Sequence, residues 1–472
     1  MKRIAIIGGG ISGLSAAYAL EETRKSGAPV EYVLFESSLR LGGVLVTDHV
    51  DGCIVEAGPD SFLTEKPWAT DLCKKIGLGD QLIGSNDCDR KIYIVTNGKL
   101  VVMPDGLMFM VPTKIMPTML SPLFSWRTKM RMAAEWFHAP HQASSDETVA
   151  QMVERHYGPE MVDILADPLL SGVYGGEASQ LSVRSVLPRF ADMESQYGSL
   201  GRAMLASRKK MKGAAKVPTR PLFTSLKDGM QQMIDSLVAR LDASALRTTL
   251  PVKALLPQSD GTGWTVYARD QADRFDAVIL ATPAQTAAAV LQSANEELAR
   301  ELGGIQYSSS VTVMLGYDEK VRHSLPPGFG FLVPRSEGRR MLAATFVHNK
   351  FSHRAPVNRA MIRSFLGGAL DEQILQSSDD EILEIVRREL REIIALNAEP
   401  LFARVYKWKS AMAQYTVGHF DRLQRIESLR QQLPTFALAG NGYSGIGVPD
   451  CVRSGTESAA KVLAAMGLGL AA

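Results

Sequence analysis

The sequence predicts a chain of mixed α/β and α+β class, in which a parallel-sheet domain is interrupted by an antiparallel sheet and by a helical region. Three observations lead to this fold class. Residues 1–36 pass from a strand through a glycine-rich turn into a helix and a second strand. Short alternating segments follow one another between residues 307 and 366, as in an antiparallel sheet. Residues 436–466 repeat the order of strand, glycine turn and helix, so the end of the chain is expected to rejoin the domain that begins it.

The first strand is predicted at residues 4–7, because a continuous run of apolar, mostly β-branched residues is typical of a strand buried on both faces. The turn at residues 8–13 reads G-x-G-x-x-G, an alanine-rich helix follows it, and the second strand ends on Glu36. This order of strand, turn, helix and terminal acid is the context in which such a turn binds a dinucleotide.

Each residue type in this turn has a physical role. Gly8 permits a tight turn off the strand, Gly10 lets a pyrophosphate approach the backbone, and Gly13 lets the helix pack closely on the sheet. The helix N-terminus offers unpaired N–H groups to phosphates, and Glu36 can accept hydrogen bonds from the hydroxyls of a ribose. The predicted contacts here are Gly8, Gly9, Gly10, Ile11, Ser12, Gly13 and Glu36.

Composition excludes several classes of protein. A chain of 472 residues with 46% hydrophobic and 22% charged residues has room for two or three ordinary globular domains. The 52 Lys and Arg residues nearly balance the 50 Asp and Glu residues, so no nucleic-acid partner is expected. The four scattered cysteines argue against a disulfide framework or a zinc site. No signal peptide and no apolar run of ~18 residues is found, so we expect a cytoplasmic protein, in which peripheral contact with the cell membrane stays open.

A second glycine-rich turn follows Glu36, at residues 37–43. In one interpretation it is a further phosphate or ribose contact, in which Arg40 supplies the charge and the paired glycines permit close approach of the backbone. In the other it is an ordinary surface turn. The candidate contacts of this turn are Ser37, Arg40, Leu41, Gly42 and Gly43.

Residues 108–136 combine several methionines and prolines with a group of cations at Arg127, Lys129 and Arg131. They are interpreted as a helical wall of a hydrophobic pocket, since flexible methionine side chains fill irregular apolar space, or as a basic amphipathic surface that contacts a membrane. The two interpretations do not exclude each other.

Local patterns and the order of segments predict discontinuous domains. An Asn-Gly pair predicts a hairpin turn within residues 91–104, and the apolar spacing of residues 379–394 predicts an amphipathic helix. The predicted domains are a Rossmann-like nucleotide domain at 1–84, 214–287 and 401–472, an inserted antiparallel-sheet substrate domain at 85–104 and 288–400, and an α-helical subdomain at 105–213.

No side-chain array of a hydrolase, no carboxylate pair and no cluster of metal ligands stands out in the sequence. His138 and His141 are three residues apart but flank Pro140, which argues against a metal pair. We therefore predict no metal and no catalytic side chain, as expected where a bound cofactor performs the chemistry.

Several motifs taken together resemble the FAD-dependent amine oxidase superfamily. They are the turns at 8–13 and 39–43, the strand end at 279–283 and the C-terminal glycine block at 440–447. Within that superfamily the chain resembles the porphyrinogen oxidases of haem biosynthesis, through residues 58–63, 168–174, 414–419 and 445–451. These motifs span residues 4–451, so the resemblance covers essentially the whole chain.

The resemblance implies a non-covalently bound FAD and oxidation of a porphyrinogen to the aromatic porphyrin, with O2 as electron acceptor and H2O2 as product. Six electrons would leave in three rounds, with hydride passing to the flavin N5. By resemblance, Val252 would contact the adenine, Trp408 would sit against the flavin, and residues 446–448 and 58–61 would lie on either side of the isoalloxazine. The added cofactor contacts are Gly58, Pro59, Asp60, Ser61, Val252, Ala281, Trp408, Gly440, Ile446, Gly447 and Val448.

The resemblance also suggests a substrate site. Lys66 aligns with a lysine that contacts a propionate in some bacterial members, although an ordinary solvated lysine is an equal interpretation. Leu169, Gly172 and Val173 fall in the loop that lines the substrate pocket. Plant and animal forms carry an arginine near the pocket mouth where this chain has Asp60, which places the chain with the bacterial forms and leaves the carboxylate anchor open.

Two other classes stay open on the sequence. One is another flavoenzyme of the superfamily, an amine oxidase or a carotenoid desaturase, although residues 309–316 lack the strand lysine that amine oxidases place near the flavin. The other is a non-enzymatic protein that kept the fold and lost FAD, like the dissociation inhibitors of small GTPases; the intact glycines and Glu36 disfavour it. The sequence does not choose between protoporphyrinogen IX and coproporphyrinogen III, or between monomer and homodimer.

Overall fold

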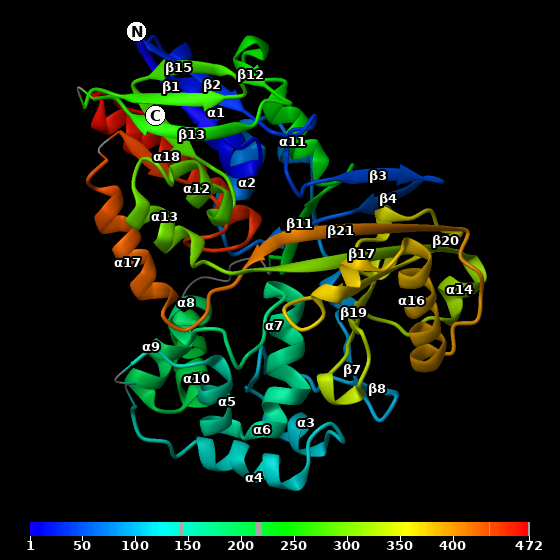
Figure 1. The fold of residues 1–472 in the computed structure, drawn as a ribbon. Coiled ribbons are helices and arrows are strands. Elements are labelled where there is room, and N and C mark those ends of the chain that lie inside the picture. Colours follow the sequence, from blue (N-terminus) through cyan, green and yellow to red (C-terminus); the bar gives the residue numbers. More distant parts are fainter. Residues whose placement is uncertain (142, 144, 213–219, 260, 434, 471–472) are drawn as a thin grey trace.

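The computed structural model describes residues 1–141, 143, 145–212, 220–259, 261–433 and 435–470. The parallel-sheet region lies at one end of the molecule with both chain termini, a long mixed sheet lies beside it, and a group of helices forms the opposite end (Figure 1). This arrangement confirms the mixed α/β and α+β class.

The parallel sheet has the strand order β12-β2-β1-β16-β22, and every neighbouring pair is parallel. The predicted order of strand, glycine turn, helix and strand at the N-terminus is confirmed, and the C-terminal strand joins the same sheet. The elements are β1 (Lys2–Ile7), α1 (Ile11–Lys25), β2 (Val30–Phe35), β12 (Leu246–Arg247), β16 (Ala277–Leu280), β22 (Phe436–Leu438) and α18 (Val448–Ala465).

Both faces of β1 are buried, because alternate side chains enter two different cores. Ile4 and Ile6 pack with α1 and α18 on one face. Ala5 and Ile7 pack on the other face against a three-stranded antiparallel sheet that carries Trp264. Burying an isoleucine contributes about 1.5–3 kcal/mol to the free energy of unfolding. The burial of β1 therefore fixes the position of the glycine-rich turn that follows it. The covering sheet consists of β13 (Val252–Pro257), β14 (Trp264–Ala268) and β15 (Gln271–Phe275).

The second sheet has seven strands in the order β21-β17-β20-β19-β18-β7-β8, all antiparallel except for the pair β18–β7. The predicted Asn-Gly hairpin is β7–β8, and the predicted helix is α16, which packs its apolar side on this sheet. The elements are β7 (Ile92–Thr96), β8 (Lys99–Val102), β17 (Tyr307–Asp318), β18 (Gly330–Leu332), β19 (Met341–Phe346), β20 (Arg359–Gly367), β21 (Phe402–Ala413) and α16 (Asp379–Ile394).

The C-terminal domain boundary drawn from the sequence differs from the sheet topology. Residues 401–472 were assigned to the nucleotide domain, yet β21 pairs along nearly its whole length with β17 of the seven-stranded sheet. The break between regular elements at residues 395–401 lies before β21, whereas the crossing to the nucleotide region follows directly on the end of β21. The chain therefore crosses between the two regions at residues 414–418, not before residue 401.

The helical subdomain is built from short helices around its own apolar core. A π-helical turn at Val162–Ala166 precedes α7, and such turns often mark functional sites. No helix of the described residues is long and apolar enough to cross a membrane. The helices are α3 (Ile115–Leu120), α4 (Trp126–Glu135), α5 (Val149–Tyr157), α6 (Pro159–Met161), α7 (Asp167–Tyr174), α8 (Val183–Val186), α9 (Pro188–Tyr197) and α10 (Leu200–Lys212).

Short elements connect these regions. They are β3 (Thr47–Val50), β4 (Cys53–Glu56), β5 (Phe62–Leu63), α2 (Pro67–Lys75), β6 (Leu82–Gly84), β9 (Leu107–Met108), β10 (Val111–Pro112), β11 (Phe223–Leu226), α11 (Gln231–Val238), α12 (Ala284–Leu291), α13 (Glu296–Gly303), α14 (Glu319–Ser324), α15 (Val347–Lys350) and α17 (His419–Arg430).

A fully buried histidine joins three helices of the subdomain. His156 on α5 lies between the carboxylates of Glu135 on α4, at 3.2 Å, and Glu194 on α9, at 2.9 Å. Burial alone would lower the pKa of His156, but the two carboxylates outweigh it and raise that pKa above its usual value. The two carboxylates therefore favour the charged form of His156, which links α4, α5 and α9.

We expect a His156→Gln variant to lower the free energy of unfolding by about 3 kcal/mol when His156 is charged. Because the folded pKa is raised, this stabilisation is fully present below the unfolded pKa near 6.5 and is lost as the pH rises through the folded value. Urea unfolding of both proteins at about pH 6 and about pH 9 measures the difference. An equal loss at both pH values would contradict a charged His156.

Candidate functional site

Of the three glycines that define the G-x-G-x-x-G turn after β1, Gly8 and Gly13 are tightly packed and Gly10 is open. Gly8 has φ +107°, and a Cβ there would lie 2.5 Å from the carbonyl oxygen of Ala281. A Cβ at Gly13 would overlap the carbonyl oxygen of Gly8, which is the close packing of helix on turn that the sequence predicts. A Cβ at Gly10, in contrast, would meet no atom within 4 Å. The open side of the turn is therefore at Gly10, where a pyrophosphate is expected.

Glu36 lies at the carboxyl end of β2 and reaches back to this turn. Its Oε2 accepts a 2.8 Å hydrogen bond from the Gly9 N–H, and its Oε1 accepts hydrogen bonds from the N–H and hydroxyl of Ser38, at 2.8 and 2.7 Å. Oε2, which accepts this one hydrogen bond, keeps a lone pair for a ribose hydroxyl. The backbone of Leu250, two residues before Val252, bonds to the Glu36 carbonyl at 2.9 Å, so the predicted adenine contact lies close by.

We expect Glu36→Ala to weaken FAD binding by about ten-fold to a hundred-fold, since a hydrogen bond to a charged group contributes roughly 1.5–3 kcal/mol. Titration of apo-protein with FAD measures this affinity. Glu31→Ala, at an exposed position of the same strand, is the matched control and should leave the affinity unchanged. Wild-type affinity in Glu36→Ala would refute the assigned role.

The second glycine turn packs directly on the first. The Gly42 N–H donates to the Gly9 carbonyl at 2.7 Å, and a Cβ at Gly43 would lie 3.3 Å from the Gly10 Cα. The guanidinium of Arg40 donates to carbonyls of its own turn, those of Leu41 at 2.8 Å and of Gly43. Arg40 thus orders the turn in this structure, and its contact with a phosphate stays a prediction.

The segment at residues 58–61 continues this surface and carries a buried ion pair. A Cβ at Gly58 would overlap the carbonyl oxygen of Val44, immediately after the second turn. The Asp60 carboxylate accepts hydrogen bonds from Lys350 Nζ at 2.8 and 3.1 Å and from the Ser61 hydroxyl at 2.7 Å. Burial acts to raise the pKa of Asp60, but Lys350 and the guanidinium of Arg363 outweigh it and hold that pKa well below its usual value.

The ion pair is part of a larger buried cluster that the sequence analysis missed. Arg363 donates to the Gly58 carbonyl, and the fully buried Arg354 pairs with Glu56 at 2.8 Å. Arg354 also donates to the Ser225 hydroxyl at 2.6 Å. A signal was present, because Arg363 stands in the middle of an apolar strand, where a cation needs a partner.

The C-terminal glycine block is held by aromatic residues of the crossing segment. The Tyr415 hydroxyl accepts from the Gly445 N–H at 2.8 Å and donates to the Asn441 carbonyl at 2.7 Å. His419 stacks on Tyr415 with ring centroids 4.2 Å apart. Trp408 Nε1 donates to the Ala57 carbonyl at 2.9 Å, so this residue lies beside the segment at residues 58–61.

The predicted substrate residues lie at two places. Leu169, Gly172 and Val173 are on α7, and the Tyr174 carbonyl at its end accepts a 2.6 Å hydrogen bond from Gln414. A Cβ at Gly172 would meet no atom within 4 Å, and Val173 is exposed, so this side of α7 is free to line a pocket. Lys66 lies at the start of α2 and is paired with a buried acid, described below.

The residues present fit a bound dinucleotide. The two turns and the residues around Val44 form one continuous surface beside the open side of Gly10. Among the residues that the structure describes, the buried Thr282 hydroxyl has no hydrogen-bond partner, and Thr282 lies two residues after β16, with its methyl group next to Gly8. The residues that the structure describes contain no group of side chains suited to bind a metal ion.

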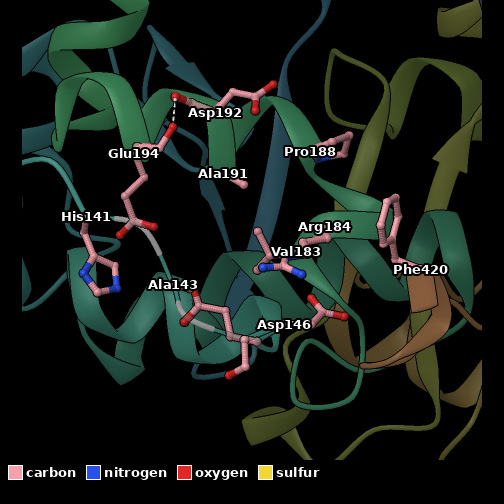
Figure 2. A pocket seen from close by; sticks show the side chains of 13 residues that line it. His141, Ala143, Asp146, Val183, Arg184, Pro188, Ala191, Asp192, Glu194 and Phe420 are labelled. Atoms are coloured by element: carbon pink, nitrogen blue, oxygen red, sulfur yellow. Dashed lines mark hydrogen bonds between the residues drawn. The ribbon is translucent and has the colours of Figure 1, made fainter.

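A cavity of about 360 Å³ lies elsewhere, in the helical subdomain (Figure 2). Its lining includes His141, Asp146, Arg184, Glu194 and Phe420, from the segment before α5, from α8, α9 and α17. It contains none of the residues predicted to bind flavin or substrate, and Glu194 and Asp146 already have partners within the fold.

Comparison with known proteins agrees with this geometry. A family profile described as flavin-containing amine oxidoreductase matches residues 11–463. The chain is 32% identical to the coproporphyrinogen III oxidase of Bacillus subtilis, over 98% of both chains. It is 27% identical to protoporphyrinogen oxidase 2 of Arabidopsis thaliana, over 98% of this chain and 94% of the other. A crystal structure from Exiguobacterium sp. 255-15, provisionally named a protoporphyrinogen oxidase, is 29% identical with a TM-score of 0.86, over 97% of this chain and 98% of that one.

Proposed function

Because the chain belongs to the family of flavin-containing amine oxidoreductases, we propose that it oxidises a porphyrinogen to the aromatic porphyrin in haem biosynthesis, with FAD as cofactor and O2 as electron acceptor. The observation that carries this proposal is the match to porphyrinogen oxidases over nearly the whole of both chains. The open glycine turn beside Glu36 supports the cofactor.

The roles of the protein's own residues follow from the site. The turn at Gly10 and the acid Glu36 would hold the pyrophosphate and the ribose, and the segments at residues 58–61 and 445–448 would enclose the ring system. When bound, the flavin supplies the redox chemistry, accepting two electrons at a time. The protein orients the macrocycle and excludes water; α7, with its exposed Val173, is the proposed wall of the substrate pocket.

We propose coproporphyrinogen III as the preferred substrate. The bacterial relatives with this name are 29–32% identical to this chain, and the plant protoporphyrinogen oxidases are 27–29% identical. Coproporphyrinogen III carries two propionates where protoporphyrinogen IX carries two vinyl groups. The preference is therefore expected to depend on the charge of the residues that line the substrate pocket. Measurement of kcat/KM on both purified porphyrinogens tests the proposal. A clear excess for protoporphyrinogen IX would contradict the preference, and no turnover of either would contradict the function.

A surface of the helical subdomain suits contact with a membrane. Its apolar side chains are exposed on and around α3 and α4, where a water-soluble protein seldom gathers so many. The exposed apolar residues are Ile115, Met116, Leu120, Trp126, Met130 and Phe137. Arg127 and Arg131 on α4 are also exposed and Lys129 is partly exposed, so cations accompany the apolar side chains. We propose that this surface makes peripheral contact with an anionic membrane.

Replacing Arg127, Lys129 and Arg131 together by serine should lower liposome affinity by roughly 3 kcal/mol, because each cation near an anionic surface contributes about 1 kcal/mol. FAD content should not change. Co-sedimentation with anionic vesicles at low and high salt measures the affinity, and neutral vesicles are the control. If the wild-type protein does not sediment with anionic vesicles, the surface is only a pocket wall.

A further inference from the structure

An ion pair joins the N-terminal part of the chain to the first turn of the last helix. Lys66 Nζ lies 2.6 Å from Asp450 Oδ2, and the Asp450 side chain is only 4% exposed whereas that of Lys66 is 39% exposed. Asp450 stands on the first turn of α18, and Lys66 immediately precedes α2. The only other cation near the carboxylate within the described residues is Arg453, at 3.9 Å. Lys66 therefore provides the direct counter-charge of a buried acid.

This buried acid lies against the C-terminal glycine segment. A Cβ at Gly445 would overlap the Asp450 carboxyl, and one at Gly447 would lie 3.2 Å from its Oδ2. The backbone of residues 445–447 thus runs along the carboxylate. This is the segment that the proposed function places beside the flavin ring system.

The last helix is fixed at two levels. Further along α18, a Cβ at Gly455 would overlap the carbonyl oxygen of Ser12, so this part of the helix packs on the start of α1. At its first turn, α18 is joined to the N-terminal part of the chain by the Lys66 ion pair, and Arg453 covers the Trp68 ring of α2 at 4.7 Å. The first contact sets where α18 lies, and the second sets where its first turn and the preceding glycines lie.

We propose that Lys66 and Asp450 form one positioning unit for the flavin: Lys66 holds the first turn of α18, and with it residues 445–447, and neutralises the buried carboxylate beside them. This inference rests on the proposed function for the identity of the cofactor. It gives Lys66 a role other than binding a propionate of the substrate. A lysine that turned to a substrate carboxylate would leave Asp450 buried without its counter-charge.

Substitutions that change the charge of Lys66 and Asp450 can distinguish a role in positioning the flavin from a role in binding a propionate of the substrate. Loss of Lys66 leaves a negative charge next to residues 445–447, which disfavours the addition of electrons to a flavin there and weakens the hold on the cofactor. Reversing both residues restores an ion pair, although a lysine on the first turn of a helix faces the positive end of the helix dipole. The reversed pair should therefore recover most, but not all, of the loss.

The experiment compares three variants. They are the single variant Lys66→Met, the charge-free double variant Lys66→Met/Asp450→Asn, and the reversed pair Lys66→Asp/Asp450→Lys. Lys75→Met, at an exposed lysine at the end of α2, the helix that follows Lys66, is the matched control. The readouts are FAD affinity of the apo-protein, the reduction potential of bound flavin, and KM for coproporphyrinogen III. We expect Lys66→Met to weaken FAD binding by about ten-fold or more and to lower the potential. The reversed pair should recover the FAD affinity to within about three-fold of wild type. The charge-free pair, which has no link to α18, should recover the potential and only part of the affinity. Lys75→Met should match wild type.

A different pattern would overturn the inference. If Lys66→Met keeps wild-type FAD affinity and potential but raises KM by about ten-fold, and charge reversal does not restore KM, then Lys66 contacts the substrate. If Lys66→Met fails to fold, the charge-free double variant still decides, because the inference requires it to bind FAD. Affinity and potential are measured without porphyrinogen. A wild-type protein that binds FAD but forms no porphyrin would therefore refute the proposed function and leave this inference standing.

Discussion

A Gly10→Val variant is expected to fold and to lose FAD almost completely. The backbone of Gly10, with φ −72° and ψ 178°, is extended and accessible to valine, and a Cβ there meets no atom within 4 Å. The side chain would instead occupy the space that a pyrophosphate needs. We expect FAD affinity to fall by more than about a hundred-fold, or roughly 3 kcal/mol, with little change in the melting temperature of the apo-protein.

Gly13→Val is the contrasting variant. Its Cβ would overlap the carbonyl oxygen of Gly8, so it should destabilise the fold itself. Absorption spectra of the purified variants, with thermal melts of the apo-proteins, separate the two effects. A Gly10→Val protein that purifies yellow with full FAD occupancy would show that Gly10 does not lie at the phosphates.

Lys350→Met is expected to produce the largest loss of stability, about 3–5 kcal/mol, because it leaves the Asp60 carboxylate buried without its closest partner. The side chains of Lys350 and Asp60 are only 12% and 18% exposed. Adding Asp60→Asn to Lys350→Met removes the unpaired charge and should recover most of the loss. Urea unfolding of the FAD-loaded proteins measures each free energy.

The matched control is an ion pair of the same kind at the surface. Arg189 and Glu65 are 2.6 Å apart, but their side chains are 74% and 66% exposed. Arg189→Met should therefore change the free energy of unfolding by less than about 1 kcal/mol. If Lys350→Met costs no more than Arg189→Met, or if the double variant is no more stable than Lys350→Met, the buried cluster does not stabilise the fold as argued.

The features predicted from the sequence are those that short segments determine. The turn at residues 8–13 is recognisable because its glycines and the flanking strand and helix lie within one short stretch. Helix α16 begins at a capping box in which Ser378 and Glu381 bond to each other's backbone, and its apolar spacing is regular. The Asn97-Gly98 turn fixes the β7–β8 hairpin in the same local way.

The features that were missed depend on residues far apart in the chain. Asp60 meets Lys350 only because the segment after the second glycine turn lies beside the seven-stranded sheet, 290 residues on. Lys66 meets Asp450 across 384 residues. The sequence shows that such charged residues exist but not which of them are buried together. The same limit explains why residues 401–413 were assigned to the nucleotide domain, since the sequence of β21 does not show that it pairs with β17.

The proposed function requires that a flavin bound to this chain oxidises a porphyrinogen. The most direct test mixes the FAD-loaded protein with coproporphyrinogen III without oxygen and then admits air, while flavin absorption, porphyrin fluorescence and H2O2 are followed. We expect the flavin absorption to bleach on mixing and to return with air, and porphyrin to accumulate with three H2O2 for each porphyrin. A flavin that stays oxidised with both coproporphyrinogen III and protoporphyrinogen IX, yet bleaches with an amine or a carotenoid precursor, would contradict the proposed function.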